Sequence, residues 1–170
     1  MLAARLKGNS VMSDFGLRIR ALDVPVGIAI GVGCQFVLVP AVSLPWAALL
    51  DRSTDELSAP AQELADKATD PLGVVLLVLI VVLGAPIVEE LFFRGLLQRS
   101  IVRRFSPGIG VAVTALVFGV SHWEVLQFPA LVAFGAVLGV MAVRTGRLGP
   151  SIVAHLAFNA VTVAALLTTS

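Results

Sequence analysis

The sequence predicts an all-α fold: a polytopic membrane helix bundle of about five transmembrane helices with a buried polar site. Three observations support this fold class. Of the 170 residues, 58% are hydrophobic and 14% are charged, whereas a soluble domain carries about 25% charged residues. Short charged joints separate apolar stretches that approach the roughly 20 residues of a membrane span. Finally, a few glutamate and histidine residues interrupt stretches that are otherwise apolar.

The N-terminal half is expected to hold one span. Residues 1–23 form a basic tail, and the apolar run after them is too long for a cleaved signal peptide, so we expect a retained signal anchor. Residues 24–50 contain no charged residue, and three prolines predict a break near the far end of this span. An acidic connector follows over residues 51–70, in which residues 58–69 are expected to form a short surface helix.

The C-terminal half is expected to hold four spans. The second span begins at Pro71 and continues as one helix past two glutamates to about Arg104. The third runs from Pro107 to about Trp123, the fourth covers about residues 128–143, and the fifth begins at Leu148. The chain thus divides into three predicted parts: the tail (1–23), the first span with its connector (24–71) and a catalytic helix bundle (72–170).

Arginine and lysine residues predict the topology. They cluster in the tail, at 94–104 and at 144–147, and alternating spans bring all three clusters to one side. The positive-inside bias makes this side the cytoplasm, so the connector and the C-terminus are expected outside a multi-pass protein of the plasma membrane. The lipid bilayer is therefore a partner, whereas the net charge of +1 gives no indication of nucleic acid binding.

Glu89 and Glu90 interrupt the apolar second span. Each charge at a helix centre costs roughly 2.5–3.5 kcal/mol on insertion scales, so an adjacent pair indicates a function. Arg94 lies four residues after Glu90 and shares its helix face, where it can neutralise the carboxylate. Glu89 points about 100° away from Glu90. We therefore expect Glu90 to be anchored and Glu89 to be free.

Two histidines and an asparagine are expected at the depth of these glutamates. His122 lies 16 residues after Ser106 and Glu90 lies 16 residues before it, so antiparallel helices would bring them to one level. In the fifth span, His155 and Asn159 share one face at i and i+4. Such a layer supplies a base, a group to orient water and donors for a developing oxyanion. We expect a common polar site.

Three ordered motifs on successive spans carry a family resemblance. They are EExxxR (Glu89, Glu90, Arg94), FxxxH (Phe118, His122) and HxxxN (His155, Asn159). Together they resemble the CPBP or Abi family of intramembrane proteases, which is related to the CAAX prenyl endopeptidases. The resemblance implies that Glu89 and His122 activate water, that His155 and Asn159 stabilise the oxyanion, and that Glu90 and Arg94 support the site.

The resemblance implies an endopeptidase that hydrolyses a membrane-associated peptide or protein entering from the bilayer. Family members have been described both as glutamate proteases and as zinc proteases. We favour the reading without a metal, in which no cofactor is needed; in the zinc alternative, Glu89, His122 and His155 would be the ligands. Two further classes stay open: a proton-coupled transporter subunit, which also uses buried ionisable residues, and a non-catalytic bacteriocin-immunity protein.

Overall fold

The computed structural model describes residues 15–169, apart from the side chains of Thr54 and Thr169; most of the predicted basic tail lies outside these residues. The first long helix consists of α3 (Asp23–Gly33), η1 (Cys34–Leu38) and α4 (Val39–Leu49), and α5 (Thr54–Ala65) follows in the connector. The second comprises α6 (Pro71–Leu77), η2 (Val78–Gly84), α7 (Ala85–Glu89), η3 (Glu90–Gln98) and α8 (Arg99–Arg104). Then come α9 (Pro107–Val120), α10 (Phe128–Thr145) and α11 (Gly149–Thr169).

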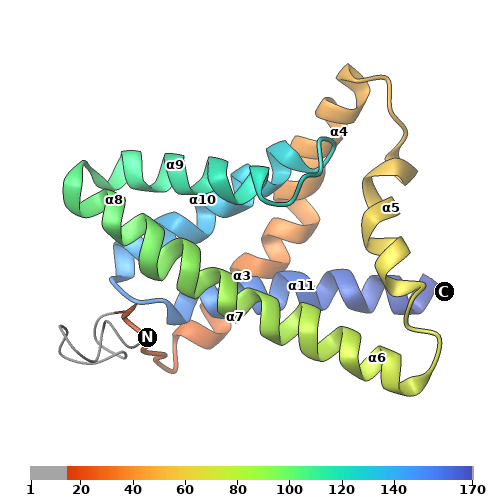
Figure 1. Ribbon diagram of the computed structural model, residues 1–170, viewed down its shortest axis with the longest axis horizontal. Coiled ribbons are helices and arrows are strands. Elements are labelled where there is room, and N and C mark those ends of the chain that lie inside the picture. The colour runs from red at the N-terminus through yellow and green to blue at the C-terminus, as the bar shows by residue number, and fades with distance from the viewer. Residues whose placement is uncertain (1–14, 170) are drawn as a thin grey trace.

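The described part of the chain is a helical membrane bundle. Four helices within it are long and apolar enough to cross a membrane: Asp23–Leu49, Pro71–Arg104, Phe128–Thr145 and Gly149–Thr168. Helix α9 is equally apolar but has only 14 residues. The fold class is confirmed, with the predicted third span shorter than expected. In Figure 1 the long green helix α6–α8 crosses the molecule, α9 folds back from its end, and α5 stands at the side opposite α8.

The first span is not broken at its prolines, contrary to the prediction. It continues as a helix through Pro40 and Pro45 to Leu49. A π-helical turn just before Pro40 accommodates that proline. The η1 segment ends two residues before Pro40, and the N–H of Val39 donates to the carbonyl of Cys34 in the i→i−5 register. This wider turn relieves the clash that a proline ring makes with the carbonyl at i−4 in a regular α-helix.

The second long helix repeats this arrangement. Its π-helical segment η2 ends two residues before Pro86, and Ala85 N–H donates to Ile80 O. In that register the next donor would be the nitrogen of Pro86, which carries no hydrogen. The carbonyl of Val81 therefore lacks a partner within its own helix, and a residue of another helix must supply the hydrogen bond.

Glycines allow the helix backbones to approach closely. A Cβ atom at Gly31 would lie 2.2 Å from the carbonyl oxygen of Ala154, so α3 and α11 touch through their backbones. Gly135 and Gly139 present α10 to side chains of α9 and η3 in the same way. Gly27 with Gly31 and Gly135 with Gly139, each pair spaced four residues apart, therefore serve helix packing, as is common in membranes.

Contacts at the two ends agree with alternating spans. At one end, Arg99 donates to Gly146 O over 3.0 Å, Arg147 pairs with Asp23, and Leu148 N–H donates to Gly16 O over 2.9 Å. Arg99, Arg147 and the described end of the basic tail thus lie on one side. At the other end, Trp46 donates to Val125 O, and Gln127 fixes α5 by donating to Leu57 O.

The connector helix α5 begins earlier than the predicted residues 58–69, because Ser53 forms its N-cap. The Ser53 hydroxyl accepts from Glu56 N–H, and the Glu56 carboxylate accepts from Ser53 N–H, which is a capping box. Pro60 lies inside the helix.

Candidate functional site

Glu90 and Arg94 form the buried ion pair that the sequence predicts. Arg94 Nη1 donates to Glu90 Oε1 over 2.8 Å, and both side chains are fully buried. Arg94 Nη2 donates to Gly135 O on α10 over 2.9 Å, and the guanidinium carbon lies 4.7 Å from the centre of the Phe118 ring. Because carboxylate and guanidinium neutralise each other and are hydrogen-bonded, the bundle can hold both charges.

His155 on α11 lies between the two glutamates. Its Nδ1 is 3.1 Å from Glu90 Oε1, the carboxylate oxygen that also accepts from Arg94 Nη1. The hydrogen therefore lies on Nδ1, and Nε2 faces Glu89 at 3.7 Å from Oε2. This distance exceeds a hydrogen bond, and the Glu89 side chain is 29% exposed whereas that of Glu90 is buried. Glu90 is thus held by its partners, whereas Glu89 makes no hydrogen bond to another described residue.

His122 makes no hydrogen bond or ion pair with either glutamate. It lies in the turn after α9, and its Nδ1 donates to the carbonyl of Phe118 over 2.8 Å, which satisfies an acceptor at the helix end. This bond fixes the hydrogen on Nδ1, so neutral His122 has a free lone pair on Nε2. The Phe118 ring links the two imidazoles, with its centre 4.7 Å from that of His122 and 5.9 Å from that of His155.

The turn that carries His122 is conformationally unusual. Trp123, its neighbour in the chain, has a φ of +58°, a left-handed conformation that is rare for a bulky residue. The Trp123 side chain is 87% exposed, so its own packing within the bundle does not explain the conformation. Such backbone strain typically occurs at functional sites.

Asn159 lies one turn beyond His155 on α11. Its Nδ2 donates to Val81 O over 2.8 Å, the carbonyl that Pro86 leaves without a donor. One side-chain N–H is used in this bond, and an amide carries two. Asn159 therefore joins α11 to the second long helix, and its remaining N–H and its oxygen are available for another role.

These contacts do not assemble a ready-made zinc site. Within residues 15–169, no three histidine, cysteine, aspartate or glutamate side chains come together as a metal ion would require. The bond from His155 Nδ1 to Glu90 leaves Nε2 available, as in many metal-bound histidines, but the Phe118 ring packs against both His155 and His122, and His122 makes no hydrogen bond or ion pair with either glutamate. The set Glu89, His122 and His155 does not fit a catalytic zinc in this arrangement, since such a site needs three converging ligands.

Gln98 is a buried polar residue that sequence reasoning missed. It donates to Gly139 O over 2.9 Å, and its Oε1 has no partner among the described residues. The sequence does contain a signal for Gln98. Glu90, Arg94 and Gln98 follow one another at intervals of four, which places them on the helix face toward α10. Phe134, whose ring centre is 5.3 Å from that of His155, had no recognisable signal.

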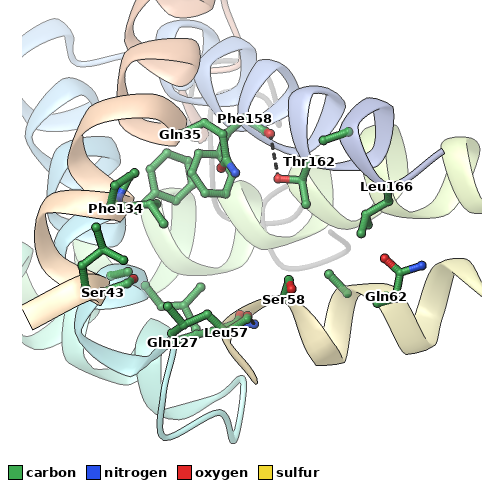
Figure 2. A pocket seen from close by; sticks show the side chains of 17 residues that line it. Gln35, Ser43, Leu57, Ser58, Gln62, Gln127, Phe134, Phe158, Thr162 and Leu166 are labelled. Carbon is green, nitrogen blue, oxygen red and sulfur yellow. Dashed lines mark hydrogen bonds between the residues drawn. The ribbon is translucent and has the colours of Figure 1, made fainter. Parts of the chain in front are cut away.

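A cavity of about 530 Å³ lies close to this site, between η1, α4, α5, α10 and α11. Figure 2 shows Phe134 and Phe158 on one side of it and side chains of α5, such as Ser58 and Gln62, on another. The two rings are stacked with centres 4.1 Å apart. Phe134 therefore lines the cavity and also contacts His155, so one aromatic layer separates the cavity from the imidazole.

The fold and the buried polar residues define a multi-pass membrane protein with a polar site inside the bundle. Residues 71–161 match the family model described as "Type II CAAX prenyl endopeptidase Rce1-like". This match covers more than half of the chain, and the chain belongs to this family, which confirms the resemblance carried by the three motifs. It is accordingly a peptidase of the CAAX-type intramembrane class. No curated protein and no solved structure matches the chain.

Proposed function

We propose that this protein is an endopeptidase that hydrolyses a peptide bond of a membrane-associated peptide or protein with a water activated by Glu89. The observation that carries the proposal is the division of the glutamate pair. Glu90 is buried and bonded to Arg94 and His155, whereas Glu89 is partly exposed and has no hydrogen bond within residues 15–169. A general base needs this freedom to approach its water.

In the proposed reaction, the Glu89 carboxylate removes a proton from water. Nε2 of His122 helps to orient that water once the turn that carries His122 has moved toward Glu89, since the two side chains are not hydrogen-bonded in the structure. The hydroxide oxygen bonds to the carbonyl carbon of the peptide. Asn159, through its remaining N–H, and His155, through Nε2 when that nitrogen is protonated, donate to the developing oxyanion. The tetrahedral intermediate collapses as the C–N bond breaks, and Glu89 returns the proton to the leaving amine.

Glu90 and Arg94 act as positioning residues in this scheme. Glu90 accepts from His155 Nδ1 and so directs Nε2 toward Glu89. Arg94 holds the Glu90 carboxylate and connects it to the backbone of α10. The proposed chemistry needs no metal or other cofactor.

The decisive experiment compares the purified parent protein with Glu89→Gln on a synthetic peptide library, with new termini read by mass spectrometry. Glutamine keeps the size and removes the basicity, so we expect cleavage to fall by at least about 10²-fold. Glu63→Gln, on the exposed face of α5, is the matched control and should cleave as the parent does. Cleavage retained by Glu89→Gln would contradict the proposal.

The same variants separate the other readings. A non-catalytic immunity protein would retain its protective effect in Glu89→Gln, and a proton-coupled transporter would lose ion coupling without ever cleaving the library. Addition of a strong chelator tests the cofactor. Activity that disappears with the chelator and returns with zinc would replace the glutamate mechanism by one in which zinc ligands assemble only with substrate.

A further inference from the structure

An open groove of about 630 Å³ lies between α3 and α10, away from the polar site. Both helices pack against α11 and make few contacts with each other. α3 begins and α10 ends at the same end of the bundle, because Arg147, which follows α10, pairs with Asp23 in the first turn of α3. The groove therefore runs from one membrane surface toward the middle of the bilayer.

The walls of the groove are apolar below its mouth. Val26 and Ile30 line it from α3, and Ala136 and Val140 line it from α10. Ala136 precedes Arg144 by eight residues, which is about 12 Å along a helix. Such walls suit a hydrocarbon chain, because they offer it apolar contact and demand no hydrogen bond. Any lipid tail could fill them, so a preference among lipids has to come from the mouth.

The mouth of the groove carries an available positive charge. Arg144 lines it from the last turn of α10, is exposed, and has no ion pair or side-chain hydrogen bond within residues 15–169. The one acidic residue of the lining, Asp23, is already neutralised, since it pairs with Arg147 and its Oδ2 accepts from Arg20 N–H over 2.7 Å. An anion at the mouth would therefore meet a free guanidinium and no unpaired carboxylate.

The start of α11 adds to this positive potential. α11 begins at Gly149, and its residue Pro150 lines the mouth of the groove. The N-terminus of a helix carries a partial positive charge, and the first turn of α11 contains no acidic residue that would compensate it. A guanidinium binds phosphate oxygens through two parallel hydrogen bonds. The groove thus offers a place for phosphate directly above a place for hydrocarbon.

We infer that this groove binds an anionic phospholipid, with its phosphate on Arg144 and an acyl chain between α3 and α10. The arginine distribution predicts that the mouth faces the cytoplasm, where basic pockets between transmembrane helices bind anionic headgroups. The joints 103–107 and 144–148 contain no acidic residue, so a second copy in the same orientation brings no counter-charge from them to Arg144. The inference does not depend on the proposed peptidase function.

Native mass spectrometry of the full-length protein in detergent measures this binding. The protein is incubated with equal amounts of dioleoyl phosphatidylglycerol and dioleoyl phosphatidylcholine, which have the same acyl chains and differ in net charge. We expect a roughly fivefold preference for phosphatidylglycerol, the effect of one arginine near an anionic headgroup. Arg144→Gln should abolish this preference. Arg103→Gln, an exposed arginine in the last turn of α8, is the matched control and should keep it.

Two further measurements test the acyl chain. Val140→Trp fills the groove and should lower phosphatidylglycerol binding at least as much as Arg144→Gln does. Its control is Val113→Trp on α9, outside the groove, because the exposure of Val113 (39%) matches that of Val140 (38%). Glycerol phosphate, which resembles the headgroup but has no acyl chain, should not displace the lipid at equal concentration. Both tryptophans replace exposed side chains, and melting curves verify that the fold is kept.

Three results would overturn the inference. Equal binding of the two lipids, or a preference that persists in Arg144→Gln, would show ordinary contact with bulk lipid only. Displacement by glycerol phosphate would show a site for free phosphate. A dimer without bound lipid that dissociates in Val140→Trp would show a second copy of the chain in the groove. None of these measurements uses cleavage, so they leave the proposed peptidase mechanism untouched.

Discussion

At the scale of single residues, the ion pair of Glu90 and Arg94 is expected to support the fold as much as the reaction. Arg94→Ala would leave the buried Glu90 carboxylate without its partner, at a cost of roughly 3–5 kcal/mol. We expect a clearly lower melting temperature and a loss of activity. Arg103→Ala, on the exposed part of the same long helix, should melt like the parent.

A double substitution sharpens this prediction. Glu90→Gln combined with Arg94→Gln removes both charges, so it should be less destabilised than Arg94→Ala although it remains inactive. If Arg94→Ala melts like the parent and only its activity falls, the pair has no structural role.

The structural role of Asn159 can be separated from its proposed role at the oxyanion, because its partner is the carbonyl that Pro86 leaves unsatisfied. Asn159→Ala should cost about 1 kcal/mol of stability, as typical for a hydrogen bond between membrane helices, and about 10²-fold in activity if Asn159 also stabilises the oxyanion. Adding Pro86→Ala supplies a backbone N–H in the i→i−5 register to Val81 O. This second change should restore stability and leave activity low. Recovery of activity together with stability would show that the amide serves only the fold.

The site could be predicted from the sequence where its contacts are local. Glu90 and Arg94 are four residues apart on one helix, so helix periodicity alone predicted their pairing. His155 approaches both glutamates across the bundle, and its shared layer with them followed from depth counting. The Phe118 ring between His122 and His155 depends on side-chain packing, and the bond from Asn159 to Val81 depends on a local π-helical register. Neither has a periodic signal in the sequence.

At the scale of secondary-structure elements, α5 offers a pH-dependent feature outside the membrane spans. The hydrogen bond from Ser53 N–H, together with the neighbouring Arg52, lowers the pKa of Glu56. A lowered pKa in the folded state means that the stabilisation is complete above the unfolded pKa of about 4.3 and is lost as pH falls through the folded value. We expect amide protection in α5 to decrease as the pH falls below about 4.3.

Hydrogen exchange, corrected for intrinsic rates, measures this effect. Glu56→Gln removes the titrating group and should flatten the pH dependence in α5, whereas protection in α10, which contains no carboxylate, should not change between the variants. A parent whose α5 protection stays constant down to pH 2 would contradict the capping argument.

Composition and turn residues predicted the helix order well, and the errors have physical causes. The second long helix was expected to run unbroken to Arg104, and it does. The prediction of a break in the first span was wrong, because a π-helical turn accommodates Pro40. No periodicity in residues 24–50 signals such a turn. Helix α9 ends at Val120 rather than near Trp123, since His122 and Ser121 bond back to Phe118 O at the helix end.

At the scale of the whole molecule, the gathering of basic residues at one end predicts its orientation. The bias of arginine toward the cytoplasm predicts that α5 is outside and that the joint near Arg103 is inside. The test uses single cysteines at positions 63 and 103 in a Cys34→Ala background. A membrane-impermeant reagent should label position 63 in intact cells and position 103 only after lysis. The reverse pattern would invert the topology and leave the site unchanged.

The ion pair within one helix also has a consequence for biosynthesis. Glu90 and Arg94 belong to the same span, so they neutralise each other as soon as that helix forms, before its neighbours have been inserted. His155 and Asn159 arrive only with α11, which follows the other spans in the chain. Until then Glu89 has neither its imidazole neighbour nor the proposed oxyanion donors of α11. A growing chain therefore carries Glu90 and Arg94 into the bilayer as a neutral pair, while the proposed site stays incomplete until α11 has been inserted.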